Sequence, residues 1–185
     1  MRIIGIDPGS VVTGSGIIEF SDGKIRLIEY DTLRLYSTEP MPFRLKKIFD
    51  FISVKIQQFH PGEFAIETAF FGKNIQSTLK LGQVRGAAII AAMNNKINID
   101  EYSPREIKKS VTGTGSASKQ QVLTIVKNIL SIKENPKFFD ASDALATALC
   151  HYFRITNFTD RLTILKNKKS SWKYYIEKHP EKILK

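Results

Sequence analysis

Cysteine is almost absent from this chain, which has a single residue of that type, Cys150, in 185. One cysteine excludes an intrachain disulfide and a zinc site made of several cysteines. Because Cys150 lies in an apolar run with helical spacing, we expect it to be a buried core residue. No apolar run is long enough to cross a membrane, and the first residues lack the pattern of a signal peptide. These absences predict a cytoplasmic protein without a membrane partner.

Histidine is also scarce, and none of His60, His151 and His179 has a partner at the short spacing typical of metal ligands. We therefore expect all three to be packed or solvated. The glycines of residues 9–16 are not followed by the Gly-Lys-Ser/Thr sequence of a phosphate-binding loop, so a hairpin explains them better. The sequence thus offers neither a histidine metal site nor a nucleotide-binding loop.

Acidic residues are in the minority, with 18 Asp and Glu against 28 Lys and Arg, which gives a net charge of +10. The excess is uneven, because residues 161–185 carry eight Lys or Arg and only two Glu. A polyanionic partner explains this balance, with nucleic acid ahead of a membrane or an acidic protein. A solvated tail in a basic proteome is the alternative that charge alone leaves open.

The pattern that is present indicates an α/β protein. Apolar runs and alternation predict strands at 2–7, 14–20, 24–35, 64–67 and 97–102, with a hairpin turn at 21–23. Helical spacing and start signals predict helices at 43–59, 75–94, from 104, at 118–130 capped by Ser118, and at 140–153. Two or three antiparallel strands followed by alternating helices and strands predict a mixed sheet with helices on both faces. We expect one domain over residues 1–155 and a basic tail over 156–185.

Four carboxylates lie in or beside apolar surroundings. Asp7 and Glu67 each end a predicted strand, so parallel pairing would bring both to one edge of the sheet, where open α/β sheets bind ligands. Asp140 and Asp143 are three residues apart at the start of a predicted helix and therefore face the same way. Two strand ends and one helix start can converge on a single point.

Four converging carboxylates repel one another and need cations. Ligands that are all oxygen favour Mg²⁺ or Mn²⁺, and two such ions roughly 3.5–4 Å apart can activate water for an in-line phosphodiester displacement. Each residue also has a simpler explanation: Asp7 can close a turn, Glu67 can face solvent, and Asp140 can cap a helix with Asp143 beside it. Asp140 is the weakest of the four, because its capping explanation is complete.

Short motifs distributed along residues 1–155 make the chain similar to a known family. They are Gly5–Ser10 with Thr13 and Gly14, Ala65–Glu67, Lys73 and Asn74, Leu79–Gln83, Arg85 and Gly86, Gly113, Gly115–Ala117, Lys119 and Asp140–Ala146. In this order and register they resemble the bacterial crossover junction endodeoxyribonucleases of the RuvC family, which are Holliday junction resolvases.

The resemblance implies a ribonuclease-H-like fold with a mixed five-stranded sheet, acting as a homodimer on four-way junction DNA. Members of the family nick two strands of like polarity symmetrically, with one acidic site for Mg²⁺ or Mn²⁺ in each subunit. Association with the branch-migration proteins RuvA and RuvB is likewise implied by the family alone. The tail after about residue 156 matches no pattern of the family that we can place.

The family's four acidic positions fall on Asp7, Glu67, Asp140 and Asp143. By resemblance Asp7 bridges two Mg²⁺ ions, Glu67 holds one of them, and Asp143 with Asp140 holds the other; Mn²⁺ can substitute. Some relatives have histidine in place of Asp140. No protein nucleophile is implied, because water activated by the metal attacks the phosphorus.

The resemblance also implies DNA contacts. An aromatic residue after the strand-ending glutamate stacks on an unpaired base in the family, and this position falls on Phe70. Phe71 adjoins it, and one of the two is expected to pack under the loop; we favour Phe70 for DNA, and the sequence leaves open which of them stacks. Two basic positions of the family fall on Lys108 and Lys119, which are expected to contact phosphates. The same role is weaker for Arg105 and Lys73, and for any one lysine a solvated surface role stays open.

Three other functions compete with this interpretation. A ribonuclease of the same fold would recognise 2′-hydroxyl groups instead of junction DNA. A junction-binding protein without catalysis is disfavoured because all four acidic positions are occupied by carboxylates. A sugar kinase or actin-like ATPase, whose first strand also ends in Asp-x-Gly, needs two similar domains and roughly twice this length.

Overall fold

A computed structural model describes residues 1–68, 74–133 and 139–156. Contacts group residues Met1–His151 into one compact unit and assign the chain from Tyr152 onward to a second. Apart from Thr156, the predicted tail lies outside the described residues. Within the described part, no helix is both long and apolar enough to cross a membrane.

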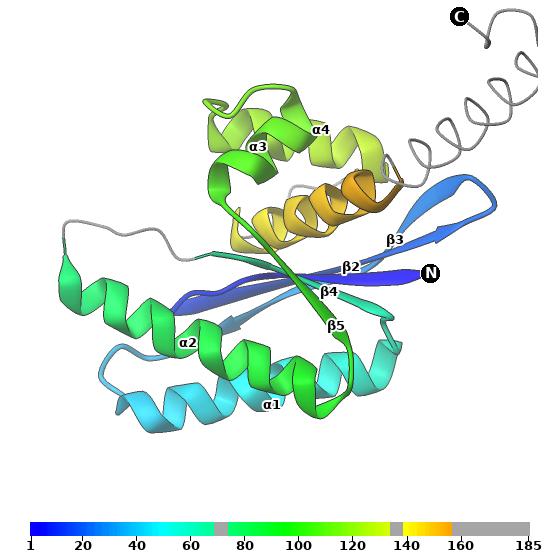
Figure 1. Cartoon of the computed structure of the whole chain (residues 1–185). Helices are drawn as coiled ribbons and strands as arrows, with labels where there is room; N and C mark the ends of the chain where they lie inside the picture. The colour runs from blue at the N-terminus through cyan, green and yellow to red at the C-terminus, as the bar shows by residue number, and fades with distance from the viewer. Residues whose placement is uncertain (69–73, 134–138, 157–185) are drawn as a thin grey trace, which may run out of the picture. The chain divides into compact units, whose positions relative to one another are not determined.

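The first unit is built on a five-stranded sheet in the order β3-β2-β1-β4-β5 (Figure 1). Its strands are β1 (Arg2–Asp7), β2 (Val12–Ser21), β3 (Lys24–Arg34), β4 (Glu63–Glu67) and β5 (Asn98–Tyr102). The first three pair antiparallel, whereas β4 is parallel to both β1 and β5. The predicted mixed five-stranded sheet is therefore confirmed. The interior of β1, Ile3–Ile6, is buried, as expected for a strand covered on both faces.

Local sequence explains the β2–β3 hairpin. Its turn residues Asp22 and Gly23 have φ values of 53° and 73°, in the left-handed region. A two-residue turn with both central φ values positive matches the right-handed twist of the strands it joins, and Asp-Gly tolerates this conformation well. The hairpin signal predicted at residues 21–23 is confirmed.

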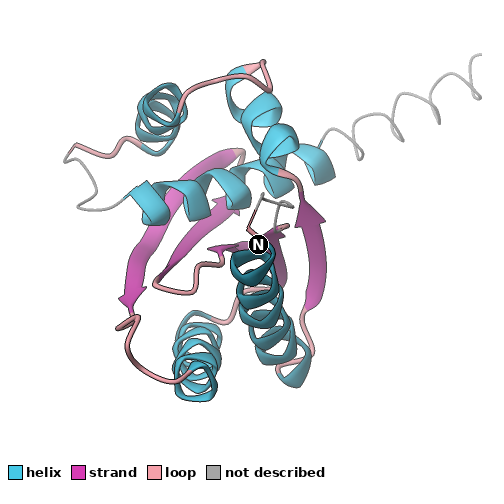
Figure 2. Cartoon of the chain, turned by 90° about the vertical axis from the view of Figure 1, so that its left-hand side faces the viewer, coloured by secondary structure: helices cyan, strands magenta, loops and turns pink. Residues whose placement is uncertain are grey.

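Helices cover both faces of the sheet, as Figure 2 shows. One face carries α1 (Met41–Phe59) and α2 (Ile75–Asn94), whose apolar residues form a core with Ile4, Ile6 and Phe64. The other face carries the helix at 139–151, near α3 (Pro104–Thr112) and α4 (Lys119–Leu130). The helix is continuous to residue 156.

The amphipathic pattern of α1 has one exception at its start. Phe43, placed on the apolar face by its spacing, is 62 % exposed, whereas the adjacent Arg44 is only 5 % exposed. The first turn of α1 lies beside the connection between β1 and β2, where Arg44 donates a hydrogen bond to the carbonyl oxygen of Ser10. A local polar contact therefore overrides the hydrophobic pattern at this end of the helix.

Glycines allow the helix at 139–151 to lie directly on the sheet. A Cβ atom on Gly5 would be 2.1 Å from the carbonyl oxygen of Ala144, and one on Gly14 would be 2.1 Å from that of Asp140. At Gly16 a Cβ would meet the Leu145 side chain at 2.7 Å. Since only glycine permits this approach, β1 and β2 fix the position of a helix that carries two of the predicted site residues.

Candidate active site

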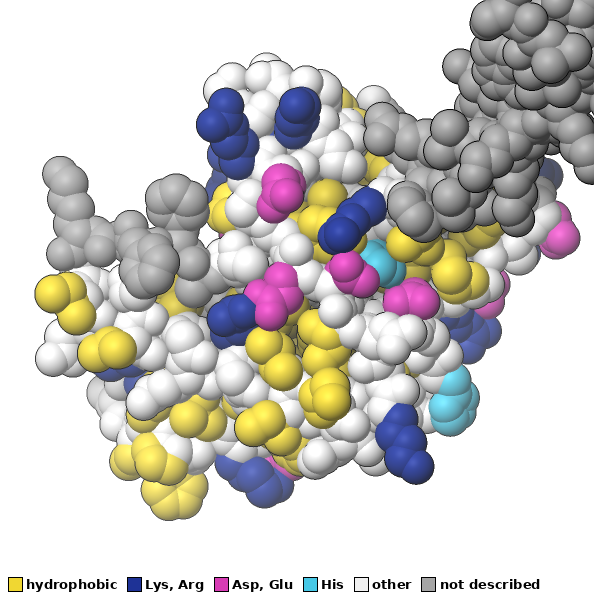
Figure 3. Space-filling view, viewed as in Figure 1, with side chains coloured by type: hydrophobic (Ala, Val, Ile, Leu, Met, Phe, Trp, Pro, Cys, Tyr) yellow, Lys and Arg dark blue, Asp and Glu magenta, His cyan; other side chains and the backbone are white. Residues whose placement is uncertain are grey.

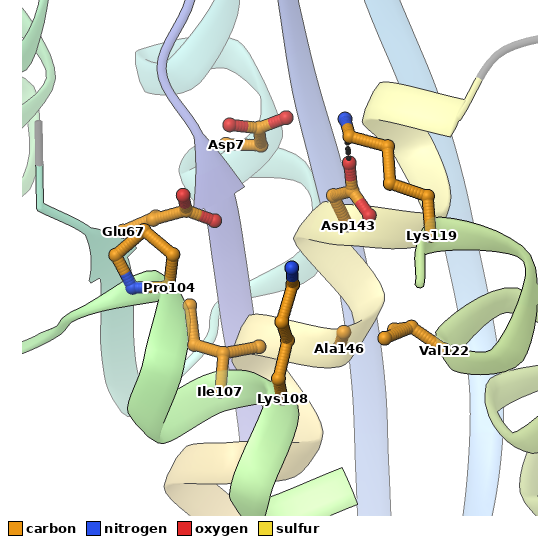
Figure 4. A pocket seen from close by; sticks show the side chains of 9 residues that line it. All are labelled: Asp7, Glu67, Pro104, Ile107, Lys108, Lys119, Val122, Asp143 and Ala146. Atoms are coloured by element: carbon orange, nitrogen blue, oxygen red, sulfur yellow. Dashed lines mark hydrogen bonds and ion pairs between the residues drawn. The ribbon is translucent and has the colours of Figure 1, made fainter. Parts of the chain in front are cut away.

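Two strand ends supply the first two carboxylates of the candidate site. β1 and β4 are parallel neighbours in which Ile6 is opposite Ile66, so Asp7 and Glu67 follow at the same edge of the sheet. Both side chains line a pocket of about 160 Å³, and Figure 4 shows Asp7 at the end of its strand with Glu67 to one side and Asp143 to the other. The two strand-ending carboxylates therefore meet at one edge of the sheet, as predicted.

The other face of the pocket comes from three helices. Asp143 enters from the helix at 139–156, Lys108 from α3 and Lys119 from the first position of α4 (Figure 4). Lys119 Nζ lies 2.7 Å from Asp143 Oδ2. The apolar part of the lining is Pro104, Ile107, Val122 and Ala146. The pocket lining therefore combines a group of charged side chains with a group of apolar side chains.

Capping fixes the two helices that bring the lysines. The Ser103 side chain accepts a hydrogen bond from the backbone of Glu106 at the start of α3, and Glu106 bonds back to the Ser103 backbone. Ser118 and Gln121 form the same reciprocal arrangement at the start of α4. Such capping boxes satisfy backbone donors that the first turn leaves unpaired. The predicted cap at Ser118 is confirmed, and it places Lys119 at the pocket.

Asp140 lies beside the pocket and does not line it. Its charge nevertheless contributes to raising the pKa of Asp7 and of Lys119. The residue lies within the helix at 139–156 rather than before its first residue, so the N-cap explanation does not hold. Its position is that of an outer carboxylate of the same acidic group.

The other simple explanations also receive no support. Among the hydrogen bonds between described residues, none ends on the side chain of Asp7, so this carboxylate does not close the turn that follows it. Glu67 faces the pocket rather than open solvent. Both carboxylates are turned toward other charged groups.

The pocket makes ionisation of these carboxylates unfavourable. Burial raises the pKa of Asp7 well above its usual value, and the charges of Glu67, Asp143 and Asp140 add to the effect, against the opposing charge of Lys119. Burial and the charge of Asp143 raise the pKa of Glu67 to about 7, while Lys119 and Lys108 oppose the shift. Two nearby lysines are therefore not enough positive charge for the group.

The donor set fits divalent magnesium or manganese. Its members are carboxylate oxygens, and the described residues that line the pocket include no thiolate or imidazole. Hard oxygen ligands favour these ions over zinc. A cation would supply the positive charge that the raised pKa values of Asp7 and Glu67 show to be lacking. Its binding would displace protons from the group.

The structure describes only some of the residues that the sequence predicts to contact DNA. Lys108 and Lys119 line the pocket. Arg105 packs its aliphatic stem against Gly115, where a Cβ would lie 2.6 Å from Arg105 Cγ. Phe70, Phe71 and Lys73 lie outside the described residues.

A second ionisable group was missed by the sequence reasoning. His151 is buried, with Nε2 3.6 Å from a Glu63 oxygen, Nδ1 3.8 Å from an Asp100 oxygen and Nδ1 2.8 Å from the Tyr102 hydroxyl. Glu63, Asp100 and His151 are close enough to hold a metal ion. The carboxylates lie beside different ring nitrogens, which equally suits charge pairing with a protonated ring. The group is formed by the pairing of β4 with β5 and by the packing of the helix that carries His151, because its members are far apart in sequence.

The two groups are distinct. Glu63 begins β4, whereas Glu67 ends it, so the histidine group and the acidic pocket lie toward opposite ends of that strand. His151 is packed, as predicted, but it is packed among charged neighbours rather than in an apolar core.

Comparison with known proteins gives consistent similarities. A sequence model of the family described as "Crossover junction endodeoxyribonuclease RuvC" matches residues 3–151. The protein of that description from Chloroherpeton thalassium is 46 % identical over 186 residues and covers 100 % of both chains. The one from Aeromonas hydrophila is 47 % identical over 150 residues, covering 81 % of this chain and 86 % of its own.

Solved structures extend the similarity to the fold. Thermus thermophilus RuvC in complex with a Holliday junction substrate superposes with a TM-score of 0.79 at 31 % identity, covering 84 % of this chain and 94 % of that one. The yeast mitochondrial Holliday junction resolvase Ydc2 has a TM-score of 0.62 at 14 % identity, covering 89 % and 85 % of the two chains, and at this identity it supports the fold alone.

Proposed function

Because the chain belongs to the RuvC family of crossover junction endodeoxyribonucleases, it is a Holliday junction resolvase, and we propose that the acidic pocket is its active site. The observation that carries this assignment is the meeting of Asp7, Glu67 and Asp143 in one pocket, with Asp140 beside it. Burial, and then the repulsion between the carboxylates, raise the pKa of Asp7 there. Carboxylates arranged in this way are suited to holding cations.

We assign the four carboxylates to two Mg²⁺ ions, with Mn²⁺ as a substitute. Asp7 lies between the two sides of the pocket and is the ligand we expect both ions to share, with Glu67 on one side and Asp143 with Asp140 on the other. When bound, the ions supply activation of the attacking water and stabilisation of the leaving oxygen. The carboxylates would hold the ions, and no protein nucleophile is needed because water would be the attacking group.

The lysines of the pocket are assigned to the DNA backbone. Lys108 and Lys119 bring positive charge next to the carboxylates, and such charges neutralise phosphates without reading sequence. Lys119 is paired with Asp143 through a 2.7 Å contact, so a phosphate entering the pocket would compete for the same ammonium group. Phe70 is proposed to stack on an unpaired base at the crossover.

We further propose a homodimer formed through α2. Four apolar residues on this helix, Ile75, Leu79, Ile90 and Met93, are between 56 % and 74 % exposed. With Gly82 and Gly86, which have no neighbour within 4 Å of a Cβ position, they form a stripe at spacings of three and four residues. Figure 3 shows exposed apolar side chains over the part of the surface where α1 and α2 lie. Such an area is suited to a second copy.

A dimer would explain symmetric nicking of two strands of like polarity, because a two-fold axis presents one acidic pocket to each strand. We also propose cooperation with RuvA and RuvB, which the family implies, and a cytoplasmic location, which the sequence pattern predicts. Both are expectations for the cell rather than features of the pocket.

Cleavage of a synthetic mobile four-way junction tests the proposal. The wild-type protein is compared with Asp7→Asn in Mg²⁺, in Mn²⁺ and in EDTA. We expect paired symmetric nicks that require metal and disappear in Asp7→Asn, while that variant still binds the junction. Nicking by Asp7→Asn at the wild-type rate would refute the site assignment, and cleavage of an RNA–DNA hybrid instead of the junction would refute the substrate.

A further inference from the structure

The connection between β1 and β2 is held by an arginine that has no acidic partner. Arg44 is 5 % exposed and donates one hydrogen bond, from Nη1 to the carbonyl oxygen of Ser10, at 2.7 Å. Its Nε atom lacks a hydrogen-bond partner among the described residues. None of the ion pairs between residues of the described ranges includes this guanidinium.

This placement is unfavourable for stability alone. Removing a cation from water is costly unless it is fully paired. Arg44 also lies in the first turn of α1, near the positive end of the helix dipole, and this turn contains no acidic residue. An apolar residue would fill the same space without either penalty. The role of the Arg44 side chain therefore lies in the group that it contacts.

What Arg44 contacts is one of three consecutive carbonyl groups that are each fixed from a different element. The Thr13 hydroxyl, on β2, donates to the Gly9 oxygen at 2.8 Å. Arg44, on α1, donates to the Ser10 oxygen. The backbone N–H of Leu35, which follows β3, donates to the Val11 oxygen at 2.8 Å. The whole connection is thereby clamped from three sides.

The connection that these three hydrogen bonds hold in place starts directly after Asp7, which is the last residue of β1. Asp7 lines one pocket with Glu67 and Asp143, and carboxylates of like charge stay together only where the backbone that carries them is held in place. A ligand group works only when supporting bonds hold it close to its productive position. Arg44 is absent from the charges that shift the pKa of Asp7, so its influence passes through the geometry of the connection.

We propose that Arg44 is a positioning residue for metal binding, which acts by holding the Ser10 carbonyl and thereby the direction of the Asp7 carboxylate. This inference rests on the proposed function, in which Asp7 is a metal ligand. Loss of the arginine is expected to weaken divalent cation binding while leaving the junction-binding surface intact.

The test is the affinity of the full-length, DNA-free protein for Mn²⁺, measured by electron paramagnetic resonance of the free ion. Arg44→Met is expected to weaken binding by about 10- to 100-fold, the usual effect of losing a supporting partner of a metal ligand. Arg44→Lys keeps a donor for the Ser10 carbonyl and is expected to restore most of the affinity. Lys46→Met, on the same helix with an exposed pair to Asp50, is the matched control and is expected to bind as the wild type.

Two further measurements separate positioning from stability. Junction binding in EDTA and thermal unfolding followed by circular dichroism are recorded for each variant. An Arg44→Met protein that is folded, or only less stable, and keeps wild-type Mn²⁺ affinity overturns the inference. If this variant does not fold, Thr13→Val removes the neighbouring bond to the Gly9 carbonyl and is expected to weaken Mn²⁺ binding in the same direction. Unchanged affinity in Thr13→Val then overturns the premise that the β1–β2 connection, which Arg44 helps to hold, positions Asp7, and the inference falls with it.

Asp7→Asn in the same titration distinguishes the two proposals. If Asp7→Asn keeps Mn²⁺ affinity, the assignment of the active site fails. If Asp7→Asn loses affinity and Arg44→Met keeps it, only the positioning role of Arg44 fails.

Discussion

At the scale of single residues, Glu67 shows how the pocket stores unfavourable charge. Its pKa of about 7 reflects burial first and the Asp143 carboxylate second. An acid whose pKa is raised in the folded state binds more protons folded than unfolded. Stability of the metal-free protein therefore falls as the pH rises from about 4.5, the unfolded value, to about 7. The repulsion between carboxylates, which favours cation binding, therefore destabilises the folded protein when no cation is bound.

We expect Glu67→Gln to stabilise the metal-free protein at pH 8 by on the order of 1–3 kcal/mol, because the substitution removes a buried charge among like charges. At pH 4 Glu67 is protonated in both states and the difference should vanish. Urea unfolding in EDTA at the two pH values measures this. A destabilised variant at pH 8 would contradict the interpretation, and Glu101→Gln, which changes a carboxylate paired with Arg85 outside the pocket, controls for a general effect of charge.

At the scale of elements, the helix at 139–156 is the part whose placement matters most to the site. It carries Asp140 and Asp143, and its backbone touches the sheet at Gly5 and Gly14. Because these contacts are backbone to backbone, a side chain at either glycine displaces the helix rather than a flexible neighbour. The close packing of this helix on the sheet therefore also fixes the position of its carboxylates in the site.

Gly14→Ala is therefore expected to reduce junction cleavage strongly and to destabilise the protein by about 1–3 kcal/mol, the usual result of overpacking. Its Cβ would lie 2.1 Å from the Asp140 carbonyl oxygen, so the helix that carries Asp143 must move. Gly62→Ala is the matched control, since no atom lies within 4 Å of its Cβ position. Cleavage rates and thermal unfolding of the two variants check the prediction; wild-type cleavage by Gly14→Ala would show that the pocket tolerates displacement of the helix.

Much of this could be predicted from the sequence because its signals are local. The strand ends that carry Asp7 and Glu67, the i, i+3 spacing of Asp140 and Asp143, and the cap at Ser118 all depend on neighbouring residues. Each of these features is encoded within a few residues, so the sequence alone indicates it.

What could not be predicted depends on contacts between distant segments. The Lys119–Asp143 ion pair joins two helices, and the partners of His151 become visible only when β4 and β5 are paired. The burial of Arg44 depends on where the β1–β2 connection lies relative to α1. No periodicity along the chain contains this information.

At the scale of the whole molecule, the apolar stripe on α2 predicts how subunits assemble. Leu79→Lys places a charge in the stripe and is expected to give a monomer, because burying an unpaired charge in an interface is unfavourable. Tyr36→Lys, at a residue that is 78 % exposed and lies outside α1 and α2, is the matched control and should stay dimeric. Sedimentation velocity measures the state, and a Leu79→Lys protein that remains a dimer would place the interface elsewhere.

The pocket also takes its carboxylates from the first strand, the middle of the chain and the last helix of the described region. During synthesis the antiparallel hairpins of the sheet can form early, because their contacts are local, whereas the parallel strands and the final helix join across long stretches of chain. A growing polypeptide therefore lacks Asp143 until almost all of the catalytic domain has left the ribosome. The acidic pocket is therefore completed only by one of the last segments of the described chain to be synthesised.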